Sequence, residues 1–329
     1  MPVLSVIMAF HRVTPFLEPA VRSILDQTWR DFEFIIVDNG TGAGLAALGG
    51  AGCDPRVKLI PFAANRGVPA TVNAACAVAT GEFIAIMDSD DVALPARFER
   101  QLAVLRAEPA LALLAAHALV VDETGAVVRP QFTLAAERDE RTYSDYSLPI
   151  TNPTVMGRRA IFLAFPWREE FSIGSDYDFF ARVIERHPCR ALPEVLLHYR
   201  RHEGQVTTSR FDEMVLGASL VRIVTARRRA GRPENLAELA RATAAWSAGR
   251  MPPAAGTYGH FAALALAEGF PLLAVFFGRR HFSKNLTPAG LLRAAVILLR
   301  ALAQAPGRSV TLVRMFLTGP LRTHGLRPL

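Results

Sequence analysis

Three acidic residues directly follow an apolar stretch of the chain. The run Phe83–Met87 suits only a buried strand, and it ends at Asp88, Asp90 and Asp91. Carboxylates at the end of a strand are hard oxygen ligands, placed where Mg²⁺ or Mn²⁺ could bind together with substrate phosphates. The same acids also suit an Asp-rich turn that caps the next helix. Taken alone, the segment leaves both interpretations open.

A second acid, Asp38, also ends an apolar run, at residues 32–37. An Asx-type turn before Gly40 would explain Asp38 by itself. In open α/β sheets, however, ligands bind beyond the carboxyl ends of the strands. Two independent strands that each deliver an acid to one edge of a sheet favour a binding site over turn chemistry.

Further polar residues could complete such a site. Asp176 and Asp178 open a predicted helix over residues 174–185, and the positive end of the helix dipole explains at least one of the two carboxylates. We interpret Asp178 as structural and Asp176 as available for chemistry, with a simple helix cap as the alternative. His202 follows two arginines, so it is either a site residue or an ordinary surface histidine.

The elements that must position these residues alternate between strands and helices. Apolar runs predict strands, and the spacing of apolar residues predicts helices between them. This alternation predicts an α/β fold with a mainly parallel sheet covered on both faces. The predicted strands are 3–9, 32–37, 57–62, 83–87 and a hairpin over 111–128; the predicted helices are 16–25, 69–80, 93–106 and 174–185. Residues 132–150 are polar and predict a loop over the site.

The composition bounds the class of protein. The chain has 329 residues, of which 51% are hydrophobic, which excludes a disordered chain. Three widely spaced cysteines fit neither a disulfide framework nor a CxxC motif, so a reducing cytoplasm fits best. We interpret the apolar residues 3–8 as a first strand rather than a signal peptide, and we expect no export.

The charge is distributed unevenly. Residues 211–329 carry 16 Lys and Arg against five Asp and Glu, whereas the first 210 residues carry 21 basic and 25 acidic residues. We therefore place a boundary near residue 210, between domains 1–210 and 211–329. The apolar run 270–277 is too short to span a bilayer, which needs about 20 residues. The helical pattern at 291–303 includes Arg293 and Arg300, seven residues apart, and Arg314 continues that spacing.

Two interpretations of this basic tail stay open. It is either an amphipathic helix lying on an anionic inner-membrane surface or a helical region that packs on the first domain. Nucleic-acid binding is disfavoured, because the basic residues lack interleaved aromatic platforms and any known motif.

Nine segments over residues 3–209, from Ser5–Ala9 to Tyr199–His202, together resemble the family 2 glycosyltransferases, which have the GT-A fold and invert configuration. The number, order and spacing of the matching segments make the resemblance specific. These segments are Ser5–Ala9, Ile24–Thr28, Phe34–Gly40, Asn65–Gly67, Asn73, Ala79–Asp91, Asn152–Met156, Ser175–Asp178 and Tyr199–His202.

The resemblance implies a role for individual positions. Asp38 would accept a hydrogen bond from the nucleotide base, in a pocket lined by backbone near Ala9 and His11, with Arg66 as a further nucleotide contact. In the DxD element, Asp88 with Ser89 would contact the donor, Asp90 would bind Mn²⁺ or Mg²⁺, and Asp91 would be structural. Asp176 would be the catalytic base and His202 a further metal or diphosphate contact. Asn152 would lie near the acceptor, and Trp167 would either stack on a sugar or fill the core.

The function implied is inverting transfer of a sugar from a nucleotide-sugar, UDP-linked by expectation, to a glycan or lipid-linked acceptor in cell-envelope polysaccharide synthesis. One carboxylate must then take the proton of the attacking hydroxyl, and a cation must offset the charge on the leaving diphosphate. We expect a cytoplasmic protein, with the membrane's cytoplasmic face as a further location. Departures from the usual family pattern at Arg12, Val72 and Ser175 keep open a non-catalytic nucleotide-sugar-binding scaffold as the alternative.

Overall fold

A computed structural model describes most of the first 236 residues and one later helix. The described ranges are 2–131, 150–171, 173–205, 211–236 and 288–304. The chain divides into two compact units, and the second begins at Val215 after the first ends at Met214. Each unit is described by itself below.

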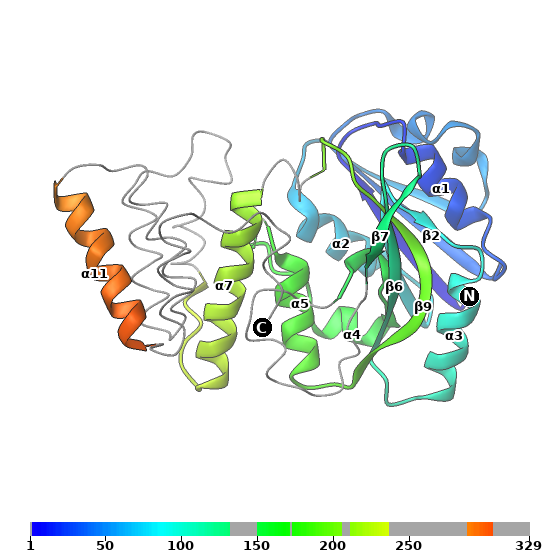
Figure 1. Ribbon diagram of the computed structural model, residues 1–329. Coiled ribbons are helices and arrows are strands. Elements are labelled where there is room, and N and C mark those ends of the chain that lie inside the picture. The colour runs from blue at the N-terminus through cyan, green and yellow to red at the C-terminus, as the bar shows by residue number, and fades with distance from the viewer. Residues whose placement is uncertain (1, 132–149, 172, 206–210, 237–287, 305–329) are drawn as a thin grey trace. The chain divides into compact units, whose positions relative to one another are not determined.

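The first unit is built on one nine-stranded sheet (Figure 1). Eight strands follow the order β3-β2-β1-β4-β8-β6-β9-β5, and β7 pairs with β6 outside that path. The strands are β1 Leu4–Phe10, β2 Phe32–Asn39, β3 Val57–Phe62, β4 Phe83–Asp88, β5 Val92–Ala93, β6 Leu113–Val121, β7 Val127–Gln131, β8 Met156–Arg158 and β9 Cys189–Arg200.

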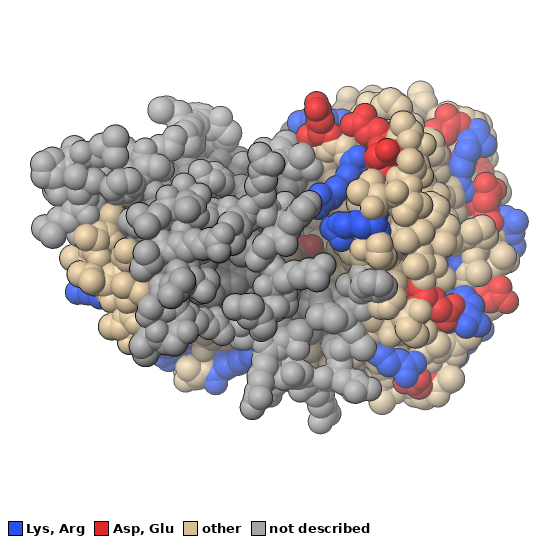
Figure 2. Space-filling model, in the orientation of Figure 1, with Lys and Arg blue, Asp and Glu red and all other residues tan. Residues whose placement is uncertain are grey.

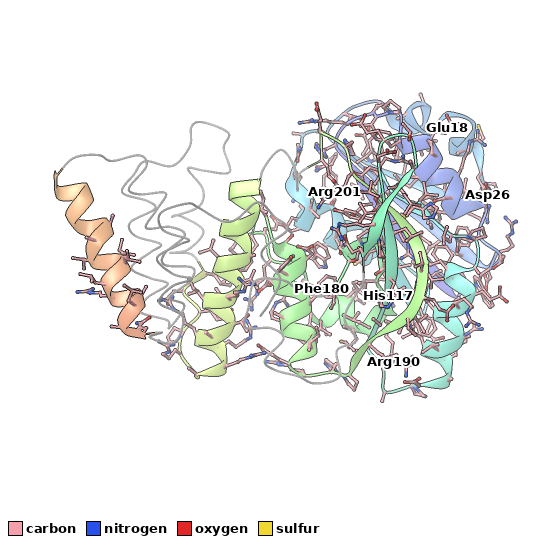
Figure 3. All side chains as sticks on the ribbon, viewed as in Figure 1. Glu18, Asp26, His117, Phe180, Arg190 and Arg201 are labelled. Carbon is pink, nitrogen blue, oxygen red and sulfur yellow. The ribbon has the colours of Figure 1, made fainter. Side chains whose placement is uncertain are left out.

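Strand direction brings the carboxyl ends of six strands, β1 to β4, β6 and β9, to one edge. Strands β1 to β4 are mutually parallel. Strand β8 is antiparallel to both β4 and β6, and β9 is parallel to β6, so β9 runs in the same direction as β4. We call the edge where these strands end the carboxyl edge. Figure 3 places Arg190 and Arg201 at opposite ends of β9, and Arg201 marks the carboxyl edge.

Helices cover both faces of the sheet because alternate strand residues point to opposite sides. Val6 and Met8 of β1 pack with α1 and α3 in one hydrophobic cluster, whereas Ile7 packs with α2, α4 and α5 in the other. The helices are α1 Leu17–Leu25, α2 Gly67–Val78, α3 Arg97–Ala107, α4 Arg159–Ala164 and α5 Ser175–Ile184, with 3₁₀ segments η1 Gly44–Cys53 and η2 Asn152–Thr154.

The predicted α/β class with a mainly parallel sheet is confirmed. The short antiparallel strands β5 and β8 were not predicted, because two or three residues carry too little pattern. The predicted loop over 132–150 lies almost entirely outside the described residues.

The second unit contains most of α7, Phe211–Arg229, and all of α11, Pro288–Gln304. Helix α11 includes the predicted helical pattern at 291–303, whereas the run 270–277 and Arg314 lie outside the described residues. Among the helices that the structure describes, none is long and apolar enough to cross a membrane.

Candidate active site

The acidic turn after β4 lies at the carboxyl edge. Asp88 is the last residue of β4 and pairs in register with Ala9 of β1. Asp88, Ser89 and Asp90 are partly exposed, whereas Asp91 is fully buried. An apolar strand thus carries its carboxylates out to the sheet's edge before the chain turns back.

Asp90 and His202 approach each other although 112 residues separate them. Their Oδ2 and Nε2 atoms lie 3.0 Å apart, and the imidazole ring packs 4.9 Å from the Phe16 ring. A carboxylate oxygen suits Mn²⁺ or Mg²⁺ as a ligand, whereas an imidazole nitrogen suits a transition metal such as Mn²⁺ better than Mg²⁺. The described residues offer no group of three His, Cys, Asp or Glu side chains for a metal. A cation held by this pair would take its other ligands from elsewhere, such as substrate phosphates.

Arg200, at the end of β9, fixes the acidic turn from the other side. Its backbone N–H donates to Asp91 Oδ1 at 2.8 Å, and its Nε donates to the Asp90 carbonyl at 3.0 Å. Its guanidinium lies 4.8 Å from the centre of the Phe16 ring. The turn is therefore held by hydrogen bonds that do not occupy the Asp90 carboxylate.

The acids in the turn destabilise one another's charged forms. Burial, followed by the charges of Asp90 and Asp176, raises the pKa of Asp88 to about 8, against the opposing effect of Arg97. Burial, followed by the charges of Asp90 and Asp88, raises the pKa of Asp91 well above its usual value. Clustered carboxylates with raised pKa values are typical of functional sites. A cation bound beside them would stabilise their ionised forms.

Asp176 lies in the first turn of α5, which begins after Gly174 in a left-handed conformation, with φ of 84°. Burial raises the pKa of Asp176 to about 6, a value that suits a general base near neutral pH. Its neighbour Asp178 is 1% exposed and ion-paired with Arg182 at 2.7 Å, Nε to Oδ2. The two acids of this helix therefore differ in their surroundings, with Asp178 tied into the fold.

Asp38 organises the loop that follows β2. Its Oδ1 accepts hydrogen bonds from the Thr41 N–H and hydroxyl at 2.8 and 2.7 Å, and its Oδ2 accepts one from the Gly44 N–H at 3.1 Å. Burial opposes ionisation, but these hydrogen bonds outweigh it and lower the pKa of Asp38. Asp38 is 1% exposed, and most of the hydrogen-bonding capacity of its carboxylate is used within the turn, as the turn interpretation predicts.

The neighbouring Asn39 holds the loop after β3 against the same edge. Its Oδ1 accepts from the Arg66 N–H at 2.8 Å, and its Nδ2 donates to Asn65 Oδ1 at 2.9 Å. The Arg66 guanidinium lies 5.0 Å from the centre of the Phe62 ring and is exposed. His11, in the loop after β1, is also exposed.

The two residues expected near the acceptor differ in their settings. Asn152 begins η2, and its Nδ2 lies 3.4 Å from Asp88 Oδ1. Trp167 is 3% exposed and its ring stacks on Phe179 in the core. Asn73 bonds to both the N–H and the carbonyl of Trp167. The surroundings of Trp167 therefore favour the core-filling alternative.

Comparison with known proteins decides the family. The sequence profile described as Glycosyl transferase family 2 matches residues 5–169. An uncharacterized glycosyltransferase of Methanocaldococcus jannaschii, MJ1057, is 30% identical over 60% of this chain and 71% of its own length. The chain belongs to glycosyl transferase family 2.

Other relatives of this family 2 chain are named for polysaccharide synthesis. The O-antigen biosynthesis glycosyltransferase WbnJ of Escherichia coli is 29% identical over 63% of this chain and 82% of its own length. Family membership identifies the chain as a glycosyltransferase, rather than the non-catalytic scaffold that the sequence left open.

Solved structures establish the GT-A fold expected for family 2. S. aureus TarS 1-349 in complex with UDP-GlcNAc has a TM-score of 0.59 and 16% identity, covering 97% of this chain and 93% of that one. A mannosyltransferase from Pyrobaculum calidifontis, in complex with GDP-Man and Mn²⁺, has a TM-score of 0.51 and 15% identity, covering 97% and 88%.

Several residues that surround the candidate site were not identified from the sequence. Arg97, Gln101 and Thr154 are fully buried beside the acidic turn, and Arg200 clamps it. A signal for the first two did exist. Positions 97 and 101 lie on the same helical stripe as the apolar residues 98, 102 and 105, where a polar residue implies a buried bonding partner.

Proposed function

We propose that this protein is a metal-dependent inverting glycosyltransferase that transfers a sugar from a UDP-sugar to a hydroxyl of a glycan or lipid-linked acceptor. The observation that carries the proposal is the 3.0 Å approach of His202 Nε2 to Asp90 Oδ2, beside the raised pKa of Asp88 at the carboxyl edge. Ligands of α/β sheets bind beyond this edge.

Asp176 acts as the general base in this proposal. Its carboxylate takes the proton from the acceptor hydroxyl while the hydroxyl oxygen attacks the anomeric carbon, and the bond from that carbon to the diphosphate oxygen breaks. Its pKa of about 6 leaves most of it ionised at pH 7, yet keeps it basic enough to accept a proton. A single displacement inverts the anomeric configuration and needs no covalent intermediate.

The acidic turn and the strand ends bind the donor. Asp90 and His202 would hold the divalent cation, which when bound offsets the charge on the leaving diphosphate. Asp88 and Ser89 contact the donor beside this pair. Ala9, His11, Asp38 and Arg66 belong to the nucleotide side, where Asp38 acts chiefly by shaping the loop at residues 41–44.

The names of the relatives support the proposed acceptor, and the charge distribution supports the proposed location. A relative named for O-antigen biosynthesis supports an acceptor in cell-envelope polysaccharide synthesis. The excess of basic residues after position 211 supports contact of the C-terminal region with the anionic cytoplasmic face of the inner membrane. On the face drawn in Figure 2, acidic and basic side chains of the described surface are interspersed.

Transfer by the wild-type protein tests the proposal. The protein is first screened with nucleoside diphosphates and nucleotide-sugars plus Mn²⁺, because a bound donor raises the unfolding temperature by mass action. The stabilising donor is then incubated with an acceptor, and the anomeric configuration of the product is determined by NMR. We expect inversion and loss of transfer with EDTA. Retention of configuration, or transfer unaffected by EDTA, would contradict the proposal.

A further inference from the structure

The two polar atoms of the Asn152 side chain differ in their hydrogen bonding. Its Nδ2 lies 3.4 Å from Asp88 Oδ1, in position to donate a hydrogen bond. Its Oδ1 is buried and has no hydrogen-bond partner among the described residues. Buried polar atoms nearly always have partners, and an unpartnered acceptor beside a site suggests a donor group supplied by a ligand.

The turn that carries Asn152 is held by a buried polar network. Gln101 Nε2 donates to the carbonyl of Thr154 at 2.8 Å and to that of Leu114 at 3.1 Å. Gln101 Oε1 accepts from Arg97 Nε at 3.1 Å, and Arg97 Nη2 donates to the carbonyl of Ile86 at 2.9 Å. One network therefore joins α3, η2 and the strand that ends at Asp88.

Thr154 fixes the other end of the same turn. Its hydroxyl donates to the Thr151 carbonyl at 2.7 Å and accepts from the Ala116 N–H at 3.2 Å. The Ile86 N–H donates to the carbonyl of Val155 at 2.9 Å. Arg97, Gln101 and Thr154 are each fully buried, so water offers no replacement bonds if the turn moves. The position of Asn152 relative to Asp88 is thus set by the fold.

We propose that Asn152 is a donor-binding residue whose Oδ1 accepts a hydrogen bond from a hydroxyl of the nucleotide-sugar while its Nδ2 orients Asp88. The buried trio Arg97, Gln101 and Thr154 are positioning residues that act through Asn152. This inference rests on the proposed function and moves Asn152 from the acceptor side to the donor side. The hydroxyl belongs either to the ribose or to the transferred sugar, which share this chemistry.

Calorimetric titration of UDP and of UDP-GlcNAc in the presence of Mn²⁺ tests the inference. Asn152→Leu removes both amide contacts at similar volume and is expected to raise the Kd about tenfold, because a buried acceptor for the ligand is lost. Weaker binding of both ligands assigns the hydroxyl to the ribose, and weaker binding of UDP-GlcNAc alone assigns it to the sugar. Unchanged affinity for both ligands would overturn the inference.

A double-mutant comparison tests the positioning role. Gln101→Met is expected to raise the donor Kd about threefold alone but to add nothing in the Asn152→Leu background, because it acts through Asn152. The matched control is Gln27→Met, because Gln27 is also fully buried and its side chain also makes three hydrogen bonds, all of them to backbone groups. Its unfolding temperature should fall as in Gln101→Met, with unchanged donor affinity.

Two results would overturn the positioning role, namely additive effects of Gln101→Met and Asn152→Leu, or equal weakening of donor binding by Gln27→Met. The proposed function fails separately. If the wild type binds no nucleoside diphosphate or nucleotide-sugar, both proposals fall. If the wild type binds donor and Asn152→Leu binds it equally well, only this inference falls.

Discussion

The two ends of the central sheet surround their acids in opposite ways. At the amino end, Glu33 of β2 is 4% exposed and accepts hydrogen bonds from the Ser5 hydroxyl, the Lys58 ammonium and both the N–H and hydroxyl of Thr80. Burial opposes its ionisation, but these partners outweigh burial and lower the pKa of Glu33 to about 2. At the carboxyl edge, the pKa of Asp88 is raised to about 8 instead.

The difference lies in the partners that surround the acids rather than in burial alone. Glu33 is saturated with donors, so its charge stabilises the fold. Among the described residues, Asp88 has a single weak donor in Asn152 and faces other carboxylates, and Asp91 Oδ2 is buried with no partner. Ionised acids are therefore unfavourable at the carboxyl edge, where a cationic ligand is expected, whereas the ionised form of Glu33 is stabilised at the amino end.

The largest expected effect is on catalysis at the carboxyl edge. Asp176→Asn removes the proposed base and is expected to lower kcat about 10³-fold, with little change in donor affinity or unfolding temperature. Initial rates of nucleoside diphosphate release measure it. Asp178→Asn is the matched control on the same helix, because Asp178 is ion-paired with Arg182. That control should lower stability while kcat per folded molecule is maintained, and the reverse pattern would contradict the assignment of the base.

The next effect is on stability at the amino end. Glu33→Gln is expected to lower the free energy of unfolding by about 2 kcal/mol, because the partners of a buried charge are left unpaired, with kcat unchanged. Denaturant unfolding measures the change. Glu194→Gln serves as the control, since its ion pair with Arg100 is solvent-exposed and should contribute less than about 1 kcal/mol. If the two substitutions lowered the free energy of unfolding equally, the buried partners of Glu33 would contribute no special stability at the amino end.

The effects of pH at the two ends of the sheet should occur in separate ranges. The pKa of Asp176 is raised to about 6 and the base is active when ionised, so kcat/KM should fall about tenfold per pH unit below about 6. The pKa of Glu33 is lowered from 4.5 to about 2, so its contribution is complete above about pH 4.5 and is lost as the pH falls toward 2. Rate profiles and unfolding curves between pH 3 and 8 measure both, and a rate that stays constant through pH 5 would exclude Asp176 as the base.

The sequence predicts the parts of this fold that have long, continuous patterns. Strands β1, β2 and β4 are almost entirely buried, so their apolar runs are unbroken, and α1 and α5 bury one clear stripe. Strand β8 has three residues and depends on neighbours far along the chain for its pairing. Such short strands arise from tertiary packing rather than from local preference.

For the candidate site, the sequence predicts which acids reach the carboxyl edge but not how they are held. Residue type and strand direction bring Asp88 and Asp90 there, whereas the approach of His202 depends on the register of β9, more than 100 residues later. The helical stripe of α3 predicts that Arg97 is buried, but not that its Nη2 donates to the carbonyl of Ile86. Long-range contacts of this kind leave little trace in local spacing.

Donor binding with and without metal tests the central claim most directly. UDP is titrated calorimetrically into the wild type, Asp90→Asn and Glu33→Gln, each with Mn²⁺ and with EDTA. We expect the wild type and Glu33→Gln to bind UDP equally and to require Mn²⁺, and we expect Asp90→Asn to lose at least tenfold in affinity. Binding by the wild type that is unaffected by EDTA, together with full affinity in Asp90→Asn, would contradict the assignment of the acidic turn as the metal and diphosphate site.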